Sequence, residues 1–296
     1  MRLTRRAAAA LGVAAVAVAQ ARRHRDRNAR RATAAVVRSA AVDEALRGEA
    51  AATVTDTKPF VAVVMAAYEE GPSVGSVLET LPPTLCGLDL FRIVVDDGSG
   101  DNTAEEARRA GAIVGSHGSN LGQGDALRSG FAIATHLGAQ VVVTMDADGQ
   151  HDPAELPTLV GPVMAGDADY VQGSRFLGRY DDAGGARDLG IRGFTWLIRL
   201  LTQADITDCT NGYRAIDGLA LTRLRLVEDR FSASEILIEA AGRGLRIHEV
   251  PVHIRSREVG TSKKPRGLGY ASGYLGAIVR SWVRARLSRP VSTELA

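Results

Sequence analysis

Four short runs of apolar residues, rich in β-branched side chains, recur between residues 59 and 174. They are PFVAVVMAA (59–67), LFRIVVD (90–96), QVVVTMD (140–146) and DYVQGS (169–174). Each run has the length of a strand and stays apolar along most of its length instead of alternating with polar residues. Strands of this kind are buried on both faces, so the pattern predicts a mostly parallel sheet.

Helical stretches separate these runs. Pro72 is suited to open the first helix, Asp101 and Thr103 offer capping groups for the second, Gly111 ends it, and a third helix covers 124–138. Alternating strands and helices predict an α/β fold of Rossmann-like type, with helices on both faces of the sheet. In such folds the ligand binds beyond the carboxyl ends of the strands.

The chain has 296 residues, which is enough to bury one sizeable core. We expect three parts. Residues 1–57 form a basic N-terminal helical arm with a linker, residues 58–265 form the α/β domain, and residues 266–296 form a C-terminal tail with an amphipathic helix.

Positive charge is concentrated at the N-terminus. The net charge is +2, but residues 1–38 hold ten Arg and one Asp, or +9, which leaves −7 for the remainder. An acidic body with 5% aromatic residues lacks the basic face and the aromatic side chains of a nucleic-acid binder, so we expect no nucleic-acid partner. Cys86 and Cys209 have no metal-ligand spacing, and reducing surroundings fit them best.

The arm contains an uninterrupted apolar run at 7–19, with three arginines before it and six shortly after it. As a helix the run would span about 20 Å, against about 30 Å of hydrocarbon, so it could cross a bilayer only with help from snorkelling arginines. A secretory or twin-arginine signal and a disordered start are competing interpretations. The charge bias favours a body at the cytoplasmic face of the membrane, with 7–19 as the candidate anchor.

Polar residues collect directly after the predicted strands. YEE (68–70) follows the first run, DDGS (96–99) begins at the end of the second, and DADGQ (146–150) begins at the end of the run at 140–146. Because the carboxyl ends of parallel strands meet at one edge of the sheet, we expect these clusters to converge.

Asp146 and Asp148 can present carboxylate oxygens to a hard cation, with Gln150 as a neutral third ligand. A bare Asp-x-Asp is more often an Asx turn. Its position after a buried strand, beside a second acidic cluster, favours a metal site here. Magnesium or manganese with so few protein ligands keeps positions open for phosphate oxygens.

The segment NLGQGDA (120–126) precedes the third predicted helix. It lacks both the GxGxxG of dinucleotide-binding folds and the lysine of a P-loop, so alone it is weak evidence. Its glycines let the loop pass close to a nucleotide or to a neighbouring strand.

Taken together, these motifs resemble family 2 glycosyltransferases of the GT-A fold, specifically the dolichyl- and polyprenyl-phosphate sugar synthases. The resemblance covers about residues 59–265. Two departures stand out: Ala66 replaces a usual proline, and Gln123 replaces a basic residue of some relatives. The motifs are VVMAAYEE, VVDDGSGDNT, NLGQGDALRSG, MDADGQHDP, QGSRFLG, TDCTNGYRA and EVPVHIRSREVGTSK.

The resemblance implies a role for each group of site residues. For the nucleotide these are Ala66, Tyr68, Glu70, Asp96, Asp97, Gly122 and Asp146. For the metal they are Asp146, Asp148 and Gln150. For the acceptor phosphate or the donor diphosphate they are Arg175, Arg257, Ser262 and Lys263. The catalytic group is Asp148, Arg175 and Asp208.

The activity so implied is inverting transfer of a sugar from a nucleotide diphosphate to a polyprenyl phosphate at a membrane surface. A lipid phosphate has a second pKa of about 6, so it is largely ionised and attacks without a general base. Arg175 can grip two phosphate oxygens at once.

The alternative acceptor is a hydroxyl of a cell-envelope glycan, a lipid or a small molecule. It would require a base, for which Asp208 and Glu235 are the candidates. Asp208 could instead orient Arg214, and a lone histidine such as His151 is more often a structural residue. A nucleotidyltransferase would bring a Gly-rich, Arg-containing first loop, and a non-catalytic binding module is disfavoured by the intact Asp pair. The sugar, the base and the oligomeric state stay open.

Overall fold

The computed structural model describes residues 31–54, 58–181, 185–256 and 268–287. The candidate anchor at 7–19 and three predicted site residues, Arg257, Ser262 and Lys263, lie outside these ranges. A helix covers residues 31–47. The following elements are α2 (Glu49–Ala52), β1 (Phe60–Ala67), α3 (Gly71–Glu79), β2 (Thr84–Leu85), β3 (Leu88–Asp96), α4 (Thr103–Arg109), β4 (Ile113–Ser116), α5 (Gln123–His136), β5 (Val141–Thr144), η1 (Pro153–Glu155), α6 (Leu156–Met164), β6 (Tyr170–Tyr180), α7 (Ala186–Thr202), β7 (Arg214–Asp217), α8 (Gly218–Thr222), α9 (Ser232–Gly242), β8 (Ile247–Ile254) and α10 (Leu268–Leu287).

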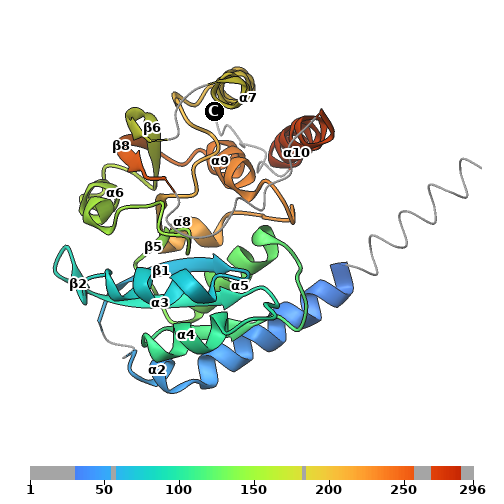
Figure 1. The fold of residues 1–296 in the computed structure, drawn as a ribbon. Coiled ribbons are helices and arrows are strands. Elements are labelled where there is room, and N and C mark those ends of the chain that lie inside the picture. The colour runs from blue at the N-terminus through green and yellow to red at the C-terminus, as the bar shows by residue number, and fades with distance from the viewer. Residues whose placement is uncertain (1–30, 55–57, 182–184, 257–267, 288–296) are drawn as a thin grey trace, which may run out of the picture.

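One sheet runs through the molecule in the order β2-β3-β1-β5-β7-β6-β8, and β4 pairs with β3. The half built from β4, β3, β1 and β5 is parallel, as the apolar runs predict. β7 inserts antiparallel between β5 and β6, and β8 runs parallel to β6. The α/β class and the helices on both faces are confirmed (Figure 1).

Two apolar cores lie on the two faces of the sheet. One core gathers side chains of α5, α9 and α10, and the other gathers those of α3, α4 and α6. The continuous apolar run of β1 follows from this arrangement, because each of its faces meets a core. Phe60, Ala62 and Val64 belong to the first core, and Val61, Val63, Met65 and Ala67 to the second.

The helix at 31–47 packs against the edge of the sheet beside β4. Ala41 and Ala45 are buried, and Glu44 accepts a hydrogen bond from the Ser116 N–H (2.9 Å). A Cβ on Gly115 would lie 2.6 Å from the Ala41 carbonyl oxygen, so glycine permits this close approach. No helix within the described residues is long and apolar enough to cross a bilayer.

Candidate active site

The carboxyl ends of the parallel strands align at one edge of the sheet. Ala67 of β1 lies opposite Asp96 of β3, and Asp96 lies opposite Ser116 of β4. Thr144, the last residue of β5, lies opposite Val64 of β1. The three polar clusters predicted from the sequence therefore begin at this edge.

The turn after β1 presents Tyr68 to solvent with 39% of its surface exposed. Glu69 adopts a left-handed conformation with φ of 56°, and its carboxylate accepts a hydrogen bond from the Gly100 N–H (2.9 Å). The Glu70 carboxylate accepts one from the Ser73 hydroxyl (3.1 Å). Tyr68 thus offers an aromatic surface, while the two glutamates order the turn.

Asp96 and Asp97 are both buried and both bind backbone groups. Asp96 accepts a hydrogen bond from the Ser99 N–H (3.1 Å). Asp97 accepts from the N–H groups of Leu121 (3.0 Å) and Gly122 (2.7 Å). The Asp97 carboxylate therefore fixes the glycine loop at 120–124 against the end of β3.

His117 completes this arrangement, although the sequence patterns gave it no role. Its Nδ1 lies 2.7 Å from the Asp97 carboxylate and its Nε2 lies 2.9 Å from the Ser129 hydroxyl on α5. The ring is fully buried. The only available signal was its position three residues before the motif at 120–130, and the periodicity of apolar residues does not reveal a role for it.

The glycine loop contacts the segment before α9. The Gly124 N–H donates a hydrogen bond to the Asp229 carbonyl (3.0 Å), and Arg128 donates to the Glu228 carbonyl (2.9 Å). A Cβ on Gly124 would lie 2.1 Å from the Glu228 carbonyl oxygen. The glycines of the loop thus serve close backbone packing, although the neighbour is the irregular segment before α9 and not a strand.

Gly124→Ala is expected to lower the free energy of unfolding by at least about 2 kcal/mol, because two backbone segments must separate. Gly161→Ala is the matched control, since nothing lies within 4 Å of a Cβ at this position in α6. It should leave stability unchanged or raise it slightly. Chemical denaturation of both variants measures the difference, and equal stabilities would contradict the packing role.

The loop after β5 carries the predicted metal ligands. Gln123 donates a hydrogen bond to the Asp146 carboxylate (3.4 Å), and Asp148 is buried and accepts from the Gln150 N–H (3.1 Å). The Gln150 side-chain amide donates to the Arg255 carbonyl (3.0 Å). This last bond ties the loop to the chain just after β8.

His151 is a structural residue of this loop. Its Nδ1 accepts a hydrogen bond from the Asp146 N–H (3.1 Å), its Nε2 donates to the Asn211 side chain (3.1 Å), and its ring stacks on Tyr213 at 4.6 Å. Burial lowers the pKa of His151, although the charges of Asp146 and Asp148 act the other way. The neutral ring holds the loop after β5 against the segment just before β7.

The donor set suits a hard cation that is bound partly by its substrate. In the part of the chain that the structure describes, no group of three or more His, Cys, Asp or Glu side chains surrounds a possible cation position. A Cβ on Gly212 would lie 3.1 Å from a carboxylate oxygen of Asp146, so glycine leaves room beside it. Two carboxylates fit magnesium or manganese, which keep several positions for water and phosphate oxygens.

Arg175 and Asp208, both predicted catalytic residues, form a buried ion pair. The Arg175 Nε lies 2.6 Å from Asp208 Oδ2, and a terminal guanidinium nitrogen lies 3.2 Å from the Thr210 hydroxyl. Asp208 Oδ1 accepts a hydrogen bond from the Thr210 N–H (3.0 Å). The guanidinium carbon sits 5.1 Å from the centre of the Tyr180 ring. Both oxygens of Asp208 are therefore engaged, Oδ2 with Arg175 and Oδ1 with Thr210.

The expectation that Asp208 could orient Arg214 is wrong. Arg214 is buried on β7 and donates hydrogen bonds to the carbonyls of Ala233 (3.0 Å) and Asn211 (2.5 Å). Glu249 of β8, which the sequence patterns left without a role, accepts from the N–H groups of Thr207 (2.7 Å) and Asp208 (2.9 Å).

Glu235 has a structural position that does not suit a base. Its carboxylate accepts hydrogen bonds from the N–H groups of Val227 (2.8 Å) and Glu228 (3.0 Å) and pairs with Arg284 of α10. It is 2% exposed. Its contacts hold the segment before α9, which in turn packs against the glycine loop.

Burial raises the pKa of Glu235 to about 7, although the two N–H donors and Arg284 act the other way. In the unfolded chain the same carboxyl has a pKa of about 4.3. Between these values the unfolded chain has lost the proton that the folded chain retains, so the free energy of unfolding falls as the pH rises.

The free energy of unfolding of the wild-type protein, measured relative to that of Glu235→Gln, is therefore expected to fall by about 3 kcal/mol between pH 4.5 and pH 7.5. Denaturation of both proteins across this window measures the loss. A difference that stayed constant, or that rose with pH, would contradict the pKa shift.

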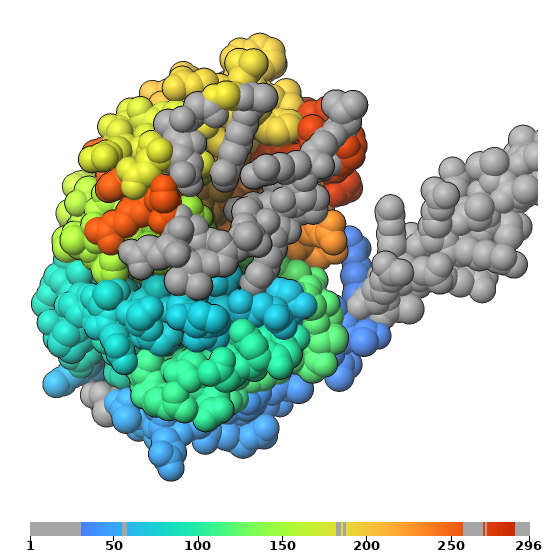
Figure 2. All heavy atoms as spheres, in the orientation of Figure 1, coloured from blue at the N-terminus to red at the C-terminus, as the bar shows by residue number. Residues whose placement is uncertain are grey.

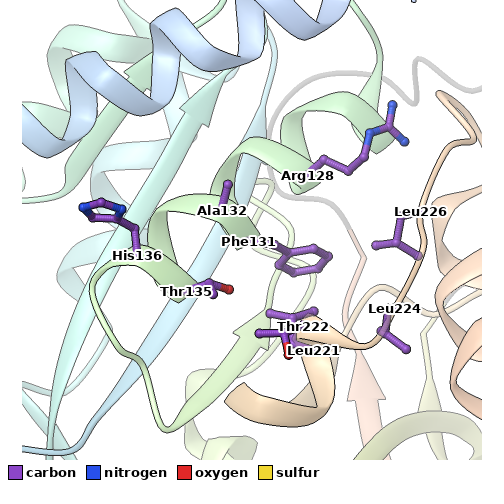
Figure 3. A pocket seen from close by; sticks show the side chains of 9 residues that line it. All are labelled: Arg128, Phe131, Ala132, Thr135, His136, Leu221, Thr222, Leu224 and Leu226. Atoms are coloured by element: carbon purple, nitrogen blue, oxygen red, sulfur yellow. The ribbon is translucent and has the colours of Figure 1, made fainter. Parts of the chain in front are cut away.

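A cavity of about 500 Å³ lies elsewhere, between α5 and the segment at 221–226 (Figure 3). Phe131 and Leu224 line its apolar side, and Arg128 lies toward the end nearer the glycine loop. None of the predicted site residues lines it. The cavity is therefore separate from the edge of the sheet where the polar clusters converge.

Comparisons with known proteins bear on the fold and the family. The sequence profile of Glycosyl transferase family 2 matches residues 62–231. The chain is 32% identical to the dolichyl-phosphate hexose transferase of Haloferax volcanii, over 77% of this chain and 96% of that protein. It is 33% identical to the polyprenol monophosphomannose synthase of Mycolicibacterium smegmatis, over 73% of this chain and 84% of that protein.

Solved structures share the fold. Glucosyl-3-phosphoglycerate synthase from Mycobacterium tuberculosis, in complex with Mn²⁺, UDP and glucosyl-3-phosphoglycerate, is 23% identical to this chain. It superposes with a TM-score of 0.60 over 82% of this chain and 83% of that chain. The expected GT-A fold is thus confirmed, and the chain belongs to glycosyl transferase family 2.

Proposed function

We propose that this chain transfers a sugar, with inversion, from a nucleotide diphosphate to a polyprenyl phosphate. The named relatives support this acceptor class, since one is a dolichyl-phosphate hexose transferase and another a polyprenol monophosphomannose synthase. The site supports it independently through its distribution of charge.

The observation that carries the proposal is the buried pair of Arg175 and Asp208. A hydroxyl acceptor needs a base, but Asp208 holds Arg175 and Thr210, and Glu235 holds backbone N–H groups and Arg284. Neither carboxylate is arranged to take a proton from an acceptor. An ionised phosphate needs no base, and it is attracted to a guanidinium whose orientation is already fixed.

Arg175 acts as a positioning cation in this mechanism. Asp208 and Thr210 hold one edge of its guanidinium, and the ring of Tyr180 lies against its face. A guanidinium held in this way loses little conformational entropy when it binds phosphate oxygens. It aligns the acceptor with the anomeric carbon, and the acceptor oxygen displaces the nucleotide diphosphate from the opposite face of the sugar.

The donor lies over the carboxyl ends of β1, β3 and β5 in this proposal. Tyr68 and the edge near Asp96 contact the nucleoside, and the loop held by Asp97 passes beside it. Asp146 and Asp148, with Gln150 as a third predicted ligand, hold magnesium or manganese on the diphosphate. A cation held there would supply electrostatic stabilisation of the negative charge on the departing diphosphate. Solved structures of the same fold contain Mn²⁺ or Mg²⁺ together with UDP.

Arg257, Ser262 and Lys263 stay predictions for phosphate contact. Arg255, two residues before Arg257, lies beside the loop after β5, because its N–H donates a hydrogen bond to the Gln150 carbonyl (2.9 Å). Arg255 itself pairs with Asp152.

A screen of nucleotide sugars tests the proposal. The purified protein is incubated with each donor, with a short-chain polyprenyl phosphate, and with Mg²⁺, Mn²⁺ or a chelator. We expect a glycosylated lipid phosphate of inverted anomeric configuration from at least one donor, and none in the chelator. Transfer that persists in the chelator would refute the metal assignment, and a retained configuration would refute the inverting mechanism.

A further inference from the structure

The helix at 31–47 turns one of its sides toward the rest of the protein. Arg38, Ala41, Glu44 and Ala45 are spaced i, i+3, i+6 and i+7, so they share this side of the helix. Ala41 and Ala45 are buried. In Figures 1 and 2 the helix lies in blue along the green part of the molecule that contains α4 and α5. The two charged residues of this side make contacts at two separate places.

Glu44 holds the end of β4. One of its carboxylate oxygens accepts a hydrogen bond from the Ser116 N–H (2.9 Å), and the other accepts one from the Ser116 hydroxyl (3.3 Å). The next residue, His117, donates its N–H to the Asp96 carbonyl (2.8 Å), and its ring contacts the Asp97 carboxylate (2.7 Å). The helix therefore fixes the point at which the chain leaves β4 and approaches the glycine loop.

Arg38 holds the other end of the glycine loop. Its guanidinium pairs with the carboxylate of Asp125, which lies in the first turn of α5, directly after the loop. Asp125 is only 4% exposed, and it also pairs with Arg128 of α5 (2.6 Å). A buried carboxylate that loses one of two cations is held less firmly, because the remaining cation must compensate its charge alone.

The loop that is held at both ends reaches the candidate donor site. Its last residues include Gln123, which donates a hydrogen bond to Asp146, a predicted metal ligand (3.4 Å). Asp97 holds the middle of the loop through two backbone N–H groups. The helix at 31–47 precedes residues 62–231, which the family profile matches. The contacts at the two ends of the loop therefore come from a part of the chain outside the matched region.

We infer that the helix at 31–47 braces the glycine loop in the conformation that binds the nucleotide diphosphate, with Arg38 as a positioning residue that acts through Asp125. This inference deepens the proposed function, on which it rests, because the loop passes beside the donor there. Without the brace the free protein populates other positions of the loop, so a smaller fraction is competent to bind. The apparent affinity for the nucleotide falls by the same factor, whereas the loaded enzyme keeps its rate.

Nucleotide binding tests the brace without turnover. The full chain and its variants are titrated with UDP, GDP, ADP, CDP and dTDP in the presence of Mn²⁺, and binding is followed by calorimetry. Arg38→Met should bind the nucleotide that the wild type prefers at least about fivefold more weakly. Arg38→Lys keeps the charge and should recover part of this loss. Arg47→Gln is the matched control, because Arg47 is an exposed arginine at the end of the same helix, and it should bind like the wild type.

Two further variants separate positioning of the loop from general stability. Val163→Ala removes part of a buried side chain on α6, so it should destabilise the fold and leave nucleotide affinity unchanged. Arg38→Met with Asp125→Asn should bind within about twofold of the weaker single variant, because each change removes the same ion pair. In transfer assays Arg38→Met should raise the donor KM by the factor that calorimetry finds, with kcat and the acceptor KM within about twofold of the wild type.

Three outcomes would overturn the inference. Wild-type affinity in Arg38→Met would show that the loop needs no brace from this helix. An equal loss of affinity in Val163→Ala would assign the effect to stability alone. Losses that multiply in the double variant would show that Arg38 and Asp125 act independently of each other.

Binding and transfer together separate this inference from the proposed function. If the wild type binds a nucleotide but transfers sugar to no lipid phosphate, the proposed acceptor is wrong, and the titrations still decide whether the helix braces the loop. If the wild type binds none of the five nucleotides, the proposed donor site and this inference are both wrong.

Discussion

Replacing Asp148 by asparagine is expected to lower the rate of sugar transfer by at least about 10²–10³-fold. The amide still accepts the hydrogen bond that the Gln150 N–H donates in the wild type, so the loop keeps its turn. It removes one of the two carboxylates available to the cation, and the departing diphosphate loses part of its stabilisation. Transfer is measured at saturating donor over a range of Mn²⁺ concentrations.

Asp167→Asn is the control for this change, because Asp167 is an exposed aspartate on the turn before β6. It should transfer at the wild-type rate. Both variants should unfold within about 1 kcal/mol of the wild type, since each keeps the shape of its side chain. Full activity of Asp148→Asn in the presence of a chelator would contradict the proposal that a metal ion takes part in the transfer.

Arg175→Ala is expected to lower transfer at least about 10²-fold while nucleotide affinity changes by less than about threefold. The variant should also lose about 3–5 kcal/mol of stability, because Asp208 is left buried without its cation. The activity loss must therefore be separated from the loss of stability. Rates and nucleotide binding are measured well below the unfolding temperature.

A double variant makes this separation. Arg175→Met with Asp208→Asn removes both charges together, so it should recover most of the lost stability and none of the lost transfer. If the acceptor were a hydroxyl and Asp208 its base, Asp208→Asn alone would cost about 10²–10⁴ in rate, and Arg175→Lys would be mild. That ordering would contradict a phosphate acceptor.

The parallel half of the sheet and its polar edge were predictable because β1, β3 and β5 are buried on both faces. Such strands leave continuous apolar runs, and the carboxyl ends of parallel strands must lie together. β4, with four residues including Gly115, is too short and too small to give a clear pattern. The antiparallel β7 has only the four residues Arg214–Asp217, so it leaves no apolar run of strand length either.

The positions of the site residues were more predictable than their partners. Asp97 was expected to contact the nucleotide, but its carboxylate holds the N–H groups of Leu121 and Gly122. The partner of Asp208 is Arg175, 33 residues earlier, with α7 between them. Such pairs depend on how the segment after α7 folds back onto the sheet. Neither the spacing of motifs nor the periodicity of apolar residues predicts this.

Glu235 has a structural role, whereas the sequence offered it as a candidate base. An acid at the start of a helix is compatible with a catalytic base, and only the contacts with Val227 and Arg284 show that its carboxylate is structural. The same contacts connect α10 to the segment that packs on the glycine loop. Tertiary contacts of this kind decide a residue's role where its type does not.

The most direct test of the central claim compares two acceptors that differ only in their head group. A short polyprenyl phosphate and the corresponding polyprenol are offered separately with the active donor and Mn²⁺, and the labelled lipid product is measured. The account predicts transfer to the phosphate and at least about 10²-fold less to the alcohol, because neither Asp208 nor Glu235 can take its proton. Equal or faster transfer to the alcohol would contradict the claim that the acceptor is a phosphate held by Arg175.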